Sequence, residues 1–361
     1  MKTVVITGSA RGFGYAMLEL FYEKNFNVVV CDINKESVEE AVTKLNGKGL
    51  GRVISFVADI TKEEDANRVI HDTLEIVPTI DIWINNAGVN QPNVALWELD
   101  KKTIDRLIDI DIKGTVLCSK LIMPVMIKQG FGQIYNVEGH GSNDAKIMGL
   151  SLYGTSKRAI TYFTEALAFE AEKKNTNVLV GKITPGIMIT NFIQTSLGDG
   201  EKIELDEKTK KVYNILGDYP ETIAKFMVDK IIKNTKNNAR FVWLSNGRAF
   251  ARFMTAGFKK RDFFGEKWFM KFDYKVKNEK GEIVSVKVLG FFKIGSLDKE
   301  YVMYSIMDDN PDSKMGAVLL GEVIRGEGNT IQILDLLEEE IDMVVAAYNE
   351  IATQIGGKLD G

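Results

Sequence analysis

The stretch "VVITGSARGFGYAMLELF" (residues 4–21) joins an apolar run, a glycine-rich turn and an amphipathic segment. The glycines Gly8, Gly12 and Gly14 permit a tight turn and let the backbone approach a pyrophosphate, while the following helix N-terminus offers N–H groups and a positive dipole end. A lone glycine triplet is a weak signal, but a predicted strand precedes this one and Asp32 ends the next predicted strand. The stretch therefore predicts a dinucleotide-binding unit, with a purely structural glycine turn as the less favoured alternative.

Short apolar runs alternate with amphipathic segments through the first 190 residues. Continuous Val/Ile runs are typical of strands that are covered on both faces, as in a parallel sheet. The alternation predicts an α/β fold, a Rossmann-type doubly wound parallel sheet. The predicted strands are 3–7, 27–32, 53–59, 80–88, 132–137 and 177–186, with a last strand in 238–245.

The character of the chain changes near residue 265, where strand patterns follow one another without intervening helices. The segment 278–282, "NEKGE", is a hairpin turn signal between the first two of these strands. An acidic helix is expected over about 335–354. We therefore predict two domains, a dinucleotide-binding domain over 1–265 and a small α+β domain over 268–361.

Composition excludes several classes of function. A net charge of −4 gives no electrostatic reason to expect nucleic acid. The two cysteines, Cys31 and Cys118, lie in apolar runs and look like core residues, and two histidines cannot build a histidine-rich metal centre, so no metal is expected. No apolar run approaches the length of a membrane span, and "MKTVVITG" resembles a strand and turn rather than a signal peptide. A cytoplasmic location is the expectation, and a membrane partner is unlikely. The basic and aromatic segment 248–264 could touch a membrane surface or a lipid-like substrate, but packing on a subunit interface is the favoured explanation.

The acid at the end of the second predicted strand bears on the choice of cofactor. Asp32 can accept hydrogen bonds from both adenosine ribose hydroxyls and would repel a 2′-phosphate, which favours NAD over NADP. Arg11 in the glycine loop could bind a 2′-phosphate, so NADP stays the alternative. Asp59, after the third strand, could contact the adenine amino group or simply cap the helix that starts near Thr61.

The motifs "TGSARGFG", "ADIT", "NNAG", "YGTSK" and "PGIMIT" occur in an order and spacing that resembles the short-chain dehydrogenase/reductase family over residues 1–265. The resemblance implies a nicotinamide cofactor, hydride transfer to or from a small-molecule carbonyl or secondary alcohol, and homodimers or homotetramers. The cofactor-binding residues that it implies are Gly8, Arg11, Gly12, Phe13, Gly14, Asp32, Ile33, Asp59, Ile60, Asn86, Ala87, Gly88, Tyr153, Lys157, Pro185, Gly186, Met188 and Thr190.

The pair Tyr153 and Lys157 carries the predicted chemistry. A ketone accepts hydride only if its oxygen is protonated or hydrogen-bonded as charge develops, and Tyr153 can supply that proton. A free phenol has a pKa near 10, and we expect the Lys157 ammonium, one helical turn on, together with the positive ring of an oxidised nicotinamide, to move the pKa of Tyr153 toward neutrality. A surface Tyr and Lys on an amphipathic helix is the ordinary explanation of an isolated Y-x-x-x-K, but the dinucleotide-binding context favours catalysis.

The active-site loop departs from the family pattern. Usual members read "NVSS" after the fifth strand, and the second Ser polarises the substrate oxygen, whereas Glu138 and Gly139 stand here. A similar N-(M/V)-(D/E)-G-x-G-S pattern occurs in a subset that resembles the plant chlorophyll b reductases, so Ser142 is predicted to orient the carbonyl. His140 and Asn143 are the alternative donors, and Glu138 is expected to anchor the loop.

A second departure is Asp111, where the family usually has an Asn that holds a water near the catalytic lysine. A carboxylate can hold the same water and pair with Lys157, so Asp111 is predicted to belong to the catalytic group. The segment 191–226 covers the family's substrate lid, and its apolar residues either contact a moderately apolar substrate or only pack the lid.

The C-terminal module resembles a small bacterial domain of unknown function, and interaction or assembly is its expected role. Its loop carboxylates Asp308, Asp309 and Asp312 form no calcium-loop pattern. The leading functional prediction is an NAD(H)-dependent oxidoreductase. The alternatives are a non-catalytic NAD(H)-binding redox sensor or interaction protein and, less favoured, a scaffold without cofactor.

Overall fold

A computed structural model divides the chain into two compact units, Met1–Phe263 and Phe264–Gly361, which are described separately. In the first unit the structure describes residues 1–189, 207–256, 261 and 263. In the second it describes residues 273–277, 283–293, 299–306, 319–325, 331–334, 336–337, 340–341 and 343–345.

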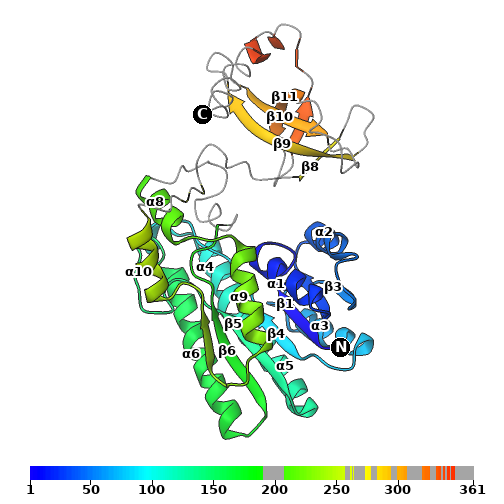
Figure 1. Ribbon diagram of the computed structural model, residues 1–361, viewed down its shortest axis with the longest axis vertical. Coiled ribbons are helices and arrows are strands. Elements are labelled where there is room, and N and C mark those ends of the chain that lie inside the picture. Colours follow the sequence, from blue (N-terminus) through cyan, green and yellow to red (C-terminus); the bar gives the residue numbers. More distant parts are fainter. Residues whose placement is uncertain are drawn as a thin grey trace. The chain divides into compact units, whose positions relative to one another are not determined.

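The first unit is built on a seven-stranded parallel sheet in the order β3-β2-β1-β4-β5-β6-β7 (Figure 1). The predicted Rossmann-type doubly wound fold is therefore confirmed. The strand order reverses between β1 and β4, and open sheets of this kind bind ligands outside the carboxyl ends of their strands at such a point. The strands are β1 Thr3–Thr7, β2 Asn27–Asp32, β3 Val53–Val57, β4 Ile82–Asn85, β5 Gly132–Val137, β6 Val178–Thr184 and β7 Ala239–Val242.

Helices cover both faces of this sheet (Figure 1). The helices are α1 Gly12–Glu23, α2 Lys35–Leu45, α3 Glu63–Ile76, α4 Lys101–Leu107, α5 Thr115–Gln129, α6 Ser151–Lys173, α8 Glu207–Leu216, α9 Pro220–Ile232 and α10 Asn246–Thr255. A 3₁₀ turn, η1, spans Leu96–Glu98, and a π-helical segment, η2, spans Ile108–Gly114 between α4 and α5.

Alternate residues of the central strands supply two separate cores. Val4 and Ile6 of β1 pack with buried residues of α1, α2 and α9, whereas Val5 packs on the opposite face with residues of α3 and α5. Successive strand side chains point to opposite faces, so a strand with both faces covered is apolar at every position. This burial explains the continuous Val/Ile runs of the sequence.

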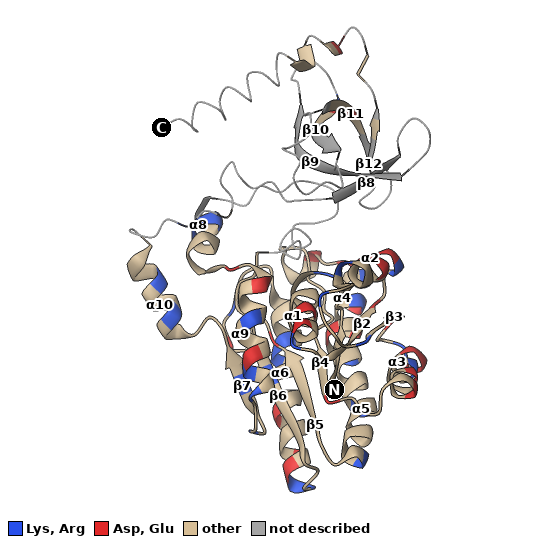
Figure 2. Ribbon diagram, turned by 45° about the vertical axis from the view of Figure 1, so that its right-hand side comes forward, with Lys and Arg blue, Asp and Glu red and all other residues tan. Residues whose placement is uncertain are grey.

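Charges of both signs are interleaved over the first unit, for example on α2, α3 and α9 (Figure 2). In the part of the chain that the structure describes, no helix combines the length and the apolar character needed to cross a membrane.

The second unit contains a five-stranded antiparallel sheet in the order β12-β11-β10-β9-β8. Its strands are β8 Asp273–Lys277, β9 Ile283–Lys293, β10 Glu300–Ile306, β11 Leu319–Arg325 and β12 Ile331–Leu334. Lys299 pairs with Glu322 of β11 at 3.0 Å and with Glu340 at 2.8 Å. The predicted turn 278–282 and Asp308, Asp309 and Asp312 lie outside the described residues.

Candidate functional site

The glycine loop between β1 and α1 packs closely against the end of β4. Gly8 has a φ of 62°, and a Cβ there would lie 2.8 Å from the Cα of Ala87, so only glycine fits. Gly12, with a φ of 60°, has no atom within 4 Å of where its Cβ would be, so this position faces open space. The loop is thus packed tightly against Ala87 at Gly8 and is open at Gly12, where a bound pyrophosphate could approach the backbone.

Hydrogen bonds fasten the carboxyl ends of β1 and β4 to each other. The Asn86 amide donates to Thr7 O and Gly8 O, both at 3.0 Å, and Thr7 Oγ1 accepts from the backbone N–H groups of Asn86 and Ala87 at 3.1 Å. Arg11, the N-cap residue of α1, makes no side-chain hydrogen bond to the first turn. The first-turn N–H groups are therefore not satisfied by a side-chain cap, which suits an anionic ligand.

Asp32 is the last residue of β2, and Asp59 lies two residues after the end of β3. Both therefore lie at the carboxyl ends of the parallel strands. The Asp32 carboxylate accepts from the N–H of Ala10 at 3.4 Å and of Asn34 at 3.3 Å, which sets it beside the glycine loop. Asp59 Oδ1 accepts from the backbone N–H and hydroxyl of Thr61 at 3.0 and 2.7 Å. This is the local turn role that the sequence left as the alternative for Asp59, and its contact with adenine stays a prediction.

The structure brings Gly88, Asp111, Tyr153 and Lys157 together. Tyr153 and Lys157 lie on α6, 9% and 7% exposed, and Lys157 Nζ is 5.4 Å from the centre of the Tyr153 ring. Lys157 Nζ pairs with Asp111 Oδ2 at 2.9 Å, and Asp111 Oδ1 accepts from the N–H of Val89 at 2.8 Å. A Cβ on Gly88 would lie 3.3 Å from both Asp111 Oδ1 and Lys157 Nζ, so glycine leaves room for the pair.

The π-helical segment η2 carries Asp111 into this group. A π-helix has an extra residue per turn and occurs mostly as a single turn at functional sites. The Asp111 side chain is completely buried, and Ser156 Oγ lies 3.4 Å from its Oδ2. The pair between Asp111 and Lys157 that the sequence allowed is therefore present as a buried ion pair.

The pKa of Tyr153 is raised above its ordinary value by burial, and the carboxylate of Asp111 adds to the rise while Lys157 opposes it. Burial acts to lower the pKa of Lys157, but Asp111 and Tyr153 outweigh it and raise that pKa. Lys157 acts on the pKa of Tyr153 in the expected direction, but the net shift is a rise, and the contribution expected of the nicotinamide ring stays a prediction. The physical reason is that burial disfavours the phenolate and Asp111 neutralises much of the ammonium's effect.

The turn after β5 explains why no serine stands at position 139. A Cβ on Gly139 would clash with the Tyr153 hydroxyl, and one on Gly141 would clash with Gly154. Ser142, 2% exposed, donates from Oγ to Gly139 O at 2.7 Å and accepts from Gly139 N at 3.2 Å. Its hydroxyl proton is thus used within the turn, and its role as carbonyl-orienting residue stays a prediction.

The other two donors considered at this turn differ in burial. Asn143 is exposed, and its Oδ1 accepts from the N–H of Ala145 at 3.4 Å. His140 is partly buried, and its Nε2 atom is buried without a hydrogen-bond partner in the described part of the chain. Burial lowers the pKa of His140, so its imidazole is neutral at pH 7.

Glu138 is a buried anchor for the active-site loops. Its side chain is fully buried, and Oε1 accepts from the Thr161 hydroxyl at 2.7 Å. Oε2 accepts from the Thr184 hydroxyl at 2.6 Å and pairs with Arg240 Nε at 2.8 Å. One carboxylate therefore joins β5, α6, β6 and β7, in the loop-anchoring role that the sequence suggested.

Asp218, which the sequence did not single out, holds the segment after β6. Its backbone N–H donates to Ile187 O at 3.1 Å, and its carbonyl accepts from Ile189 N at 3.0 Å. Its carboxylate accepts from Trp243 Nε1 at 2.6 Å and pairs with Arg252 at 2.7 Å and Arg261 at 2.6 Å. Asp218 thus fixes the segment that contains the predicted Met188, next to Pro185 and Gly186, while Thr190 and the lid residues 191–206 lie outside the described residues.

Gln91, which the sequence did not single out, holds the backbone of Tyr153 from the loop after β4. Its Oε1 accepts from the backbone N–H of Tyr153 at 2.8 Å, and its Nε2 donates to Gly149 O at 2.6 Å. Gln91 is completely buried, whereas the N-cap residue of α6, Leu150, makes no side-chain hydrogen bond. The side chain therefore supplies the missing cap at the turn that carries Tyr153.

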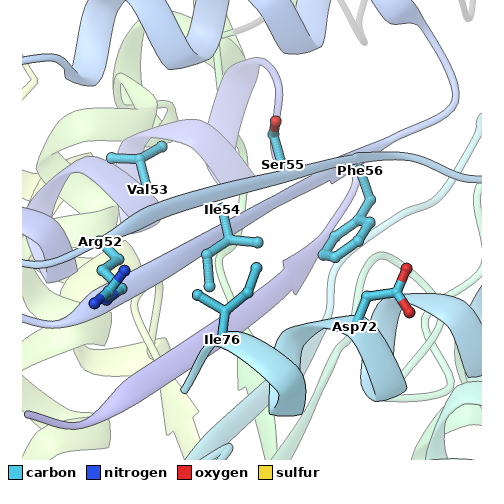
Figure 3. A pocket seen from close by; sticks show the side chains of 7 residues that line it. All are labelled: Arg52, Val53, Ile54, Ser55, Phe56, Asp72 and Ile76. Atoms are coloured by element: carbon cyan, nitrogen blue, oxygen red, sulfur yellow. The ribbon is translucent and has the colours of Figure 1, made fainter.

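A groove at the edge strand β3 contains none of the predicted site residues. It lies between β3 and α3 and opens to solvent (Figure 3). Its lining residues are Arg52, Val53, Ile54, Ser55, Phe56, Asp72 and Ile76. The described residues also contain no cluster of three or more His, Cys, Asp or Glu side chains that could hold a metal ion.

Comparison with protein families supports the resemblance noted in the sequence. A family model described as "short chain dehydrogenase" matches residues 2–200. An uncharacterized oxidoreductase of Bacillus subtilis is 35% identical over 210 residues, which are 58% of this chain and 75% of that protein. The chlorophyll(ide) b reductase NOL of Arabidopsis thaliana is 29% identical over 231 residues, 63% of this chain and 64% of that protein.

The predicted resemblance to the family and to chlorophyll b reductases is thereby confirmed. This chain spans only 54% of the length of a second Arabidopsis relative, a probable chlorophyll(ide) b reductase.

Solved structures share the fold. Levodione reductase superimposes with a TM-score of 0.62 at 21% identity over 69% of this chain and 98% of its own. The 3-ketoacyl-(acyl-carrier-protein) reductase of Brucella melitensis complexed with NADH gives 0.59, also at 21% identity, over the same shares.

Proposed function

Because this chain belongs to the short-chain dehydrogenase family and is an NAD(P)-dependent oxidoreductase, we propose that it transfers hydride between NAD(H) and a carbonyl or secondary alcohol, with Tyr153 as the acid–base. The observation that carries the proposal is the buried group of Tyr153, Lys157 and Asp111 beside Gly88. A buried lysine–aspartate pair next to a buried phenol contributes little to stability but arranges a proton donor beside a fixed positive charge.

The residues around the glycine loop suit a nicotinamide dinucleotide. Gly8, Gly12 and the uncapped N-terminus of α1 would hold the pyrophosphate, and Asp32 would hold the adenosine ribose. The predicted contacts of Asn86 to Gly88 and of Pro185 to Met188 would hold the nicotinamide end. The bound nicotinamide supplies or takes up hydride.

The chain's own groups handle the proton. In reduction, the Tyr153 hydroxyl donates its proton to the carbonyl oxygen, and the Lys157 ammonium stabilises the phenolate that remains. Asp111 keeps Lys157 protonated and in place. Because burial raises the pKa of Tyr153, its hydroxyl is protonated at pH 7, the form that can donate a proton in carbonyl reduction.

Asp111→Asn is expected to move the pH profile of the reaction to lower pH. Asp111 raises the pKa of Tyr153, so its neutral replacement lowers that pKa and populates the phenolate at lower pH. As the pH increases, alcohol oxidation, which needs the base, should begin to rise at a lower pH than in the parent protein. Carbonyl reduction, which needs the acid, should likewise begin to fall at a lower pH than in the parent protein. The measurement is kcat/KM against pH in both directions, with Asp109→Asn, a 49% exposed carboxylate in the same helical segment, as the control. A shift toward higher pH would contradict the assignment.

Asp32 supports NAD rather than NADP as the cofactor. Asp32→Ala is expected to weaken NADH binding by about tenfold or more through loss of charge-assisted hydrogen bonds to the ribose, and to strengthen NADPH binding by removing the repulsion of its 2′-phosphate. The measurement is the ratio of the two dissociation constants. Glu36→Ala, an exposed acid in the first turn of α2, is the control. An unchanged ratio would contradict the assignment of Asp32 to the ribose and would leave Arg11, which could bind a 2′-phosphate, as the residue that decides between NAD and NADP.

A homodimer or homotetramer is part of the proposal. On α6, Tyr162 is 74% exposed and Phe169 is 60% exposed, and residues seven apart lie on one face of a helix. An exposed pair of large aromatic side chains supports contact with a second copy. Three further points stay predictions: the division into domains over 1–265 and 268–361, an assembly role for the second domain, and a cytoplasmic location. The plant relatives are named as chloroplastic.

A further inference from the structure

Carbonyl reduction by this site needs a second hydrogen-bond donor beside Tyr153, and the usual serine is missing. As charge develops on the carbonyl oxygen, donors fixed in advance stabilise the transition state. Gly139, which takes the position of that serine, has no side chain, and any Cβ there would clash with the Tyr153 hydroxyl. The requirement therefore has to be met by another residue of the same turn.

Ser142 is poorly suited to this role in the arrangement observed. A serine hydroxyl has one proton to donate, and Ser142 donates it to Gly139 O at 2.7 Å. Its oxygen also accepts from Gly139 N at 3.2 Å, and the residue is 2% exposed. These bonds close the turn, so the side chain would have to break its own turn in order to reach a substrate.

His140 differs from Ser142 in its hydrogen bonding, although both residues bury a polar side-chain atom. Its Nε2 atom is buried and lacks a hydrogen-bond partner among the described residues. Buried polar atoms are nearly always paired, and an exception needs an explanation such as a catalytic role or a bound water. A neutral imidazole carries one N–H donor and can polarise a carbonyl without giving up its proton.

The neighbours of His140 place it at the acid–base residue. Gly139 packs against the hydroxyl of Tyr153, and Gly141 packs against Gly154 in the next position of α6. His140 lies between these two contacts, so its Cα is one residue away from the point where the chain contacts the Tyr153 hydroxyl. A donor on His140 would therefore start from a backbone position beside the proposed proton donor.

We propose that His140, through Nε2–H, donates the second hydrogen bond to the substrate's carbonyl oxygen, while Ser142 fixes the turn. This inference rests on the proposed function, because it concerns the same carbonyl. It makes His140 a catalytic residue and gives the site a donor pair of phenol and imidazole in place of phenol and hydroxyl.

The test compares His140→Phe, His140→Gln and Ser142→Ala in the full-length chain. The probes are NADH with benzaldehyde, cyclohexanone or 2,3-butanedione, whichever the unmodified protein reduces fastest. His140→Phe should lower kcat by about a hundredfold, as loss of one such donor does. His140→Gln, whose amide retains an N–H donor, should recover at least a tenth of the activity, and NADH affinity should be unchanged in both variants.

Two further measurements separate catalysis from structure. His140→Phe removes an unpaired buried nitrogen, so its Tm should be equal to or above that of the parent protein, whereas Ser142→Ala should lower Tm and reduce kcat by less than His140→Phe. His71→Phe, whose imidazole is 73% exposed on α3, is the matched control.

A normal kcat for His140→Phe together with a hundredfold loss for Ser142→Ala would overturn the inference and restore Ser142. In that case Tyr153→Phe would still abolish turnover, which would leave the proposed function intact. Full activity in Tyr153→Phe would instead overturn the proposed function, and the inference with it.

Discussion

Tyr153→Phe is expected to abolish turnover while leaving the affinity for NADH nearly unchanged. The substitution removes one hydroxyl, the proposed proton donor, and keeps the ring that packs near Lys157 Nζ and Gly139. General acid–base catalysis contributes about 10²- to 10⁴-fold to rate, and we expect kcat to fall toward the upper end of that range because the donor is lost entirely. Steady-state rates and a fluorescence titration with NADH measure the two quantities.

The matched control is Tyr219→Phe, at the N-cap of α9, where the tyrosine is 47% exposed. It should retain the kcat of the parent protein. A large loss of NADH affinity in Tyr153→Phe would show that the hydroxyl belongs to the cofactor site rather than to proton transfer. A kcat within tenfold of the parent value would remove Tyr153 from the acid–base role.

Lys157→Met is expected to lower both stability and activity. Lys157 and Asp111 form a pair whose side chains are 8% and 0% exposed, and loss of one partner leaves a buried, uncompensated charge. Breaking such a pair destabilises a protein by about 3–5 kcal/mol. Turnover should also fall by about a hundredfold or more, because the Tyr153 phenolate loses its stabilising ammonium. Urea unfolding and steady-state kinetics measure the two effects.

The double variant Lys157→Met/Asp111→Asn separates these effects. It removes both charges, so the free energy of unfolding should return close to that of the parent protein, since a buried pair is often no more stable than neutral residues of similar size. Activity should stay low, because no ammonium faces the phenolate. Recovery of activity together with stability would mean that Lys157 acts only through folding, and unchanged stability in the single variant would contradict the buried ion pair.

The fold and the proximity of Tyr153 and Lys157 could be predicted because their signals are local. The Val/Ile runs of β1 and β2 report strands buried on both faces, and the glycine loop lies within one βα turn. Tyr153 and Lys157 are four residues apart on one helix, so their spacing alone puts them side by side.

Other parts of the site could not be predicted, because they depend on contacts between distant residues. Gln91 binds the backbone of Tyr153 across 62 positions, and Arg240 meets Glu138 across 102. No periodicity or motif reports such contacts. The rise in the pKa of Tyr153 has a similar origin, because it comes mainly from burial, which exists only in the folded chain.

Ser142 shows how a motif can be located without its geometry. The pattern N-x-E-G-x-G-S placed a hydroxyl near the active site, but it carried no information about where that hydroxyl donates. The structure directs it to Gly139 O and leaves Nε2 of His140 as the unpaired buried atom of the turn among the described residues.

The most direct test of the central claim, an NAD(H)-dependent site built on the glycine loop and Asp32, is a fluorescence titration of this 361-residue chain with NADH and, separately, with NADPH. The account predicts saturable NADH binding that is clearly tighter than NADPH binding, and a loss of this preference in Asp32→Ala. Failure to bind either nucleotide would contradict the account, because the glycine loop would then be architecture without a cofactor.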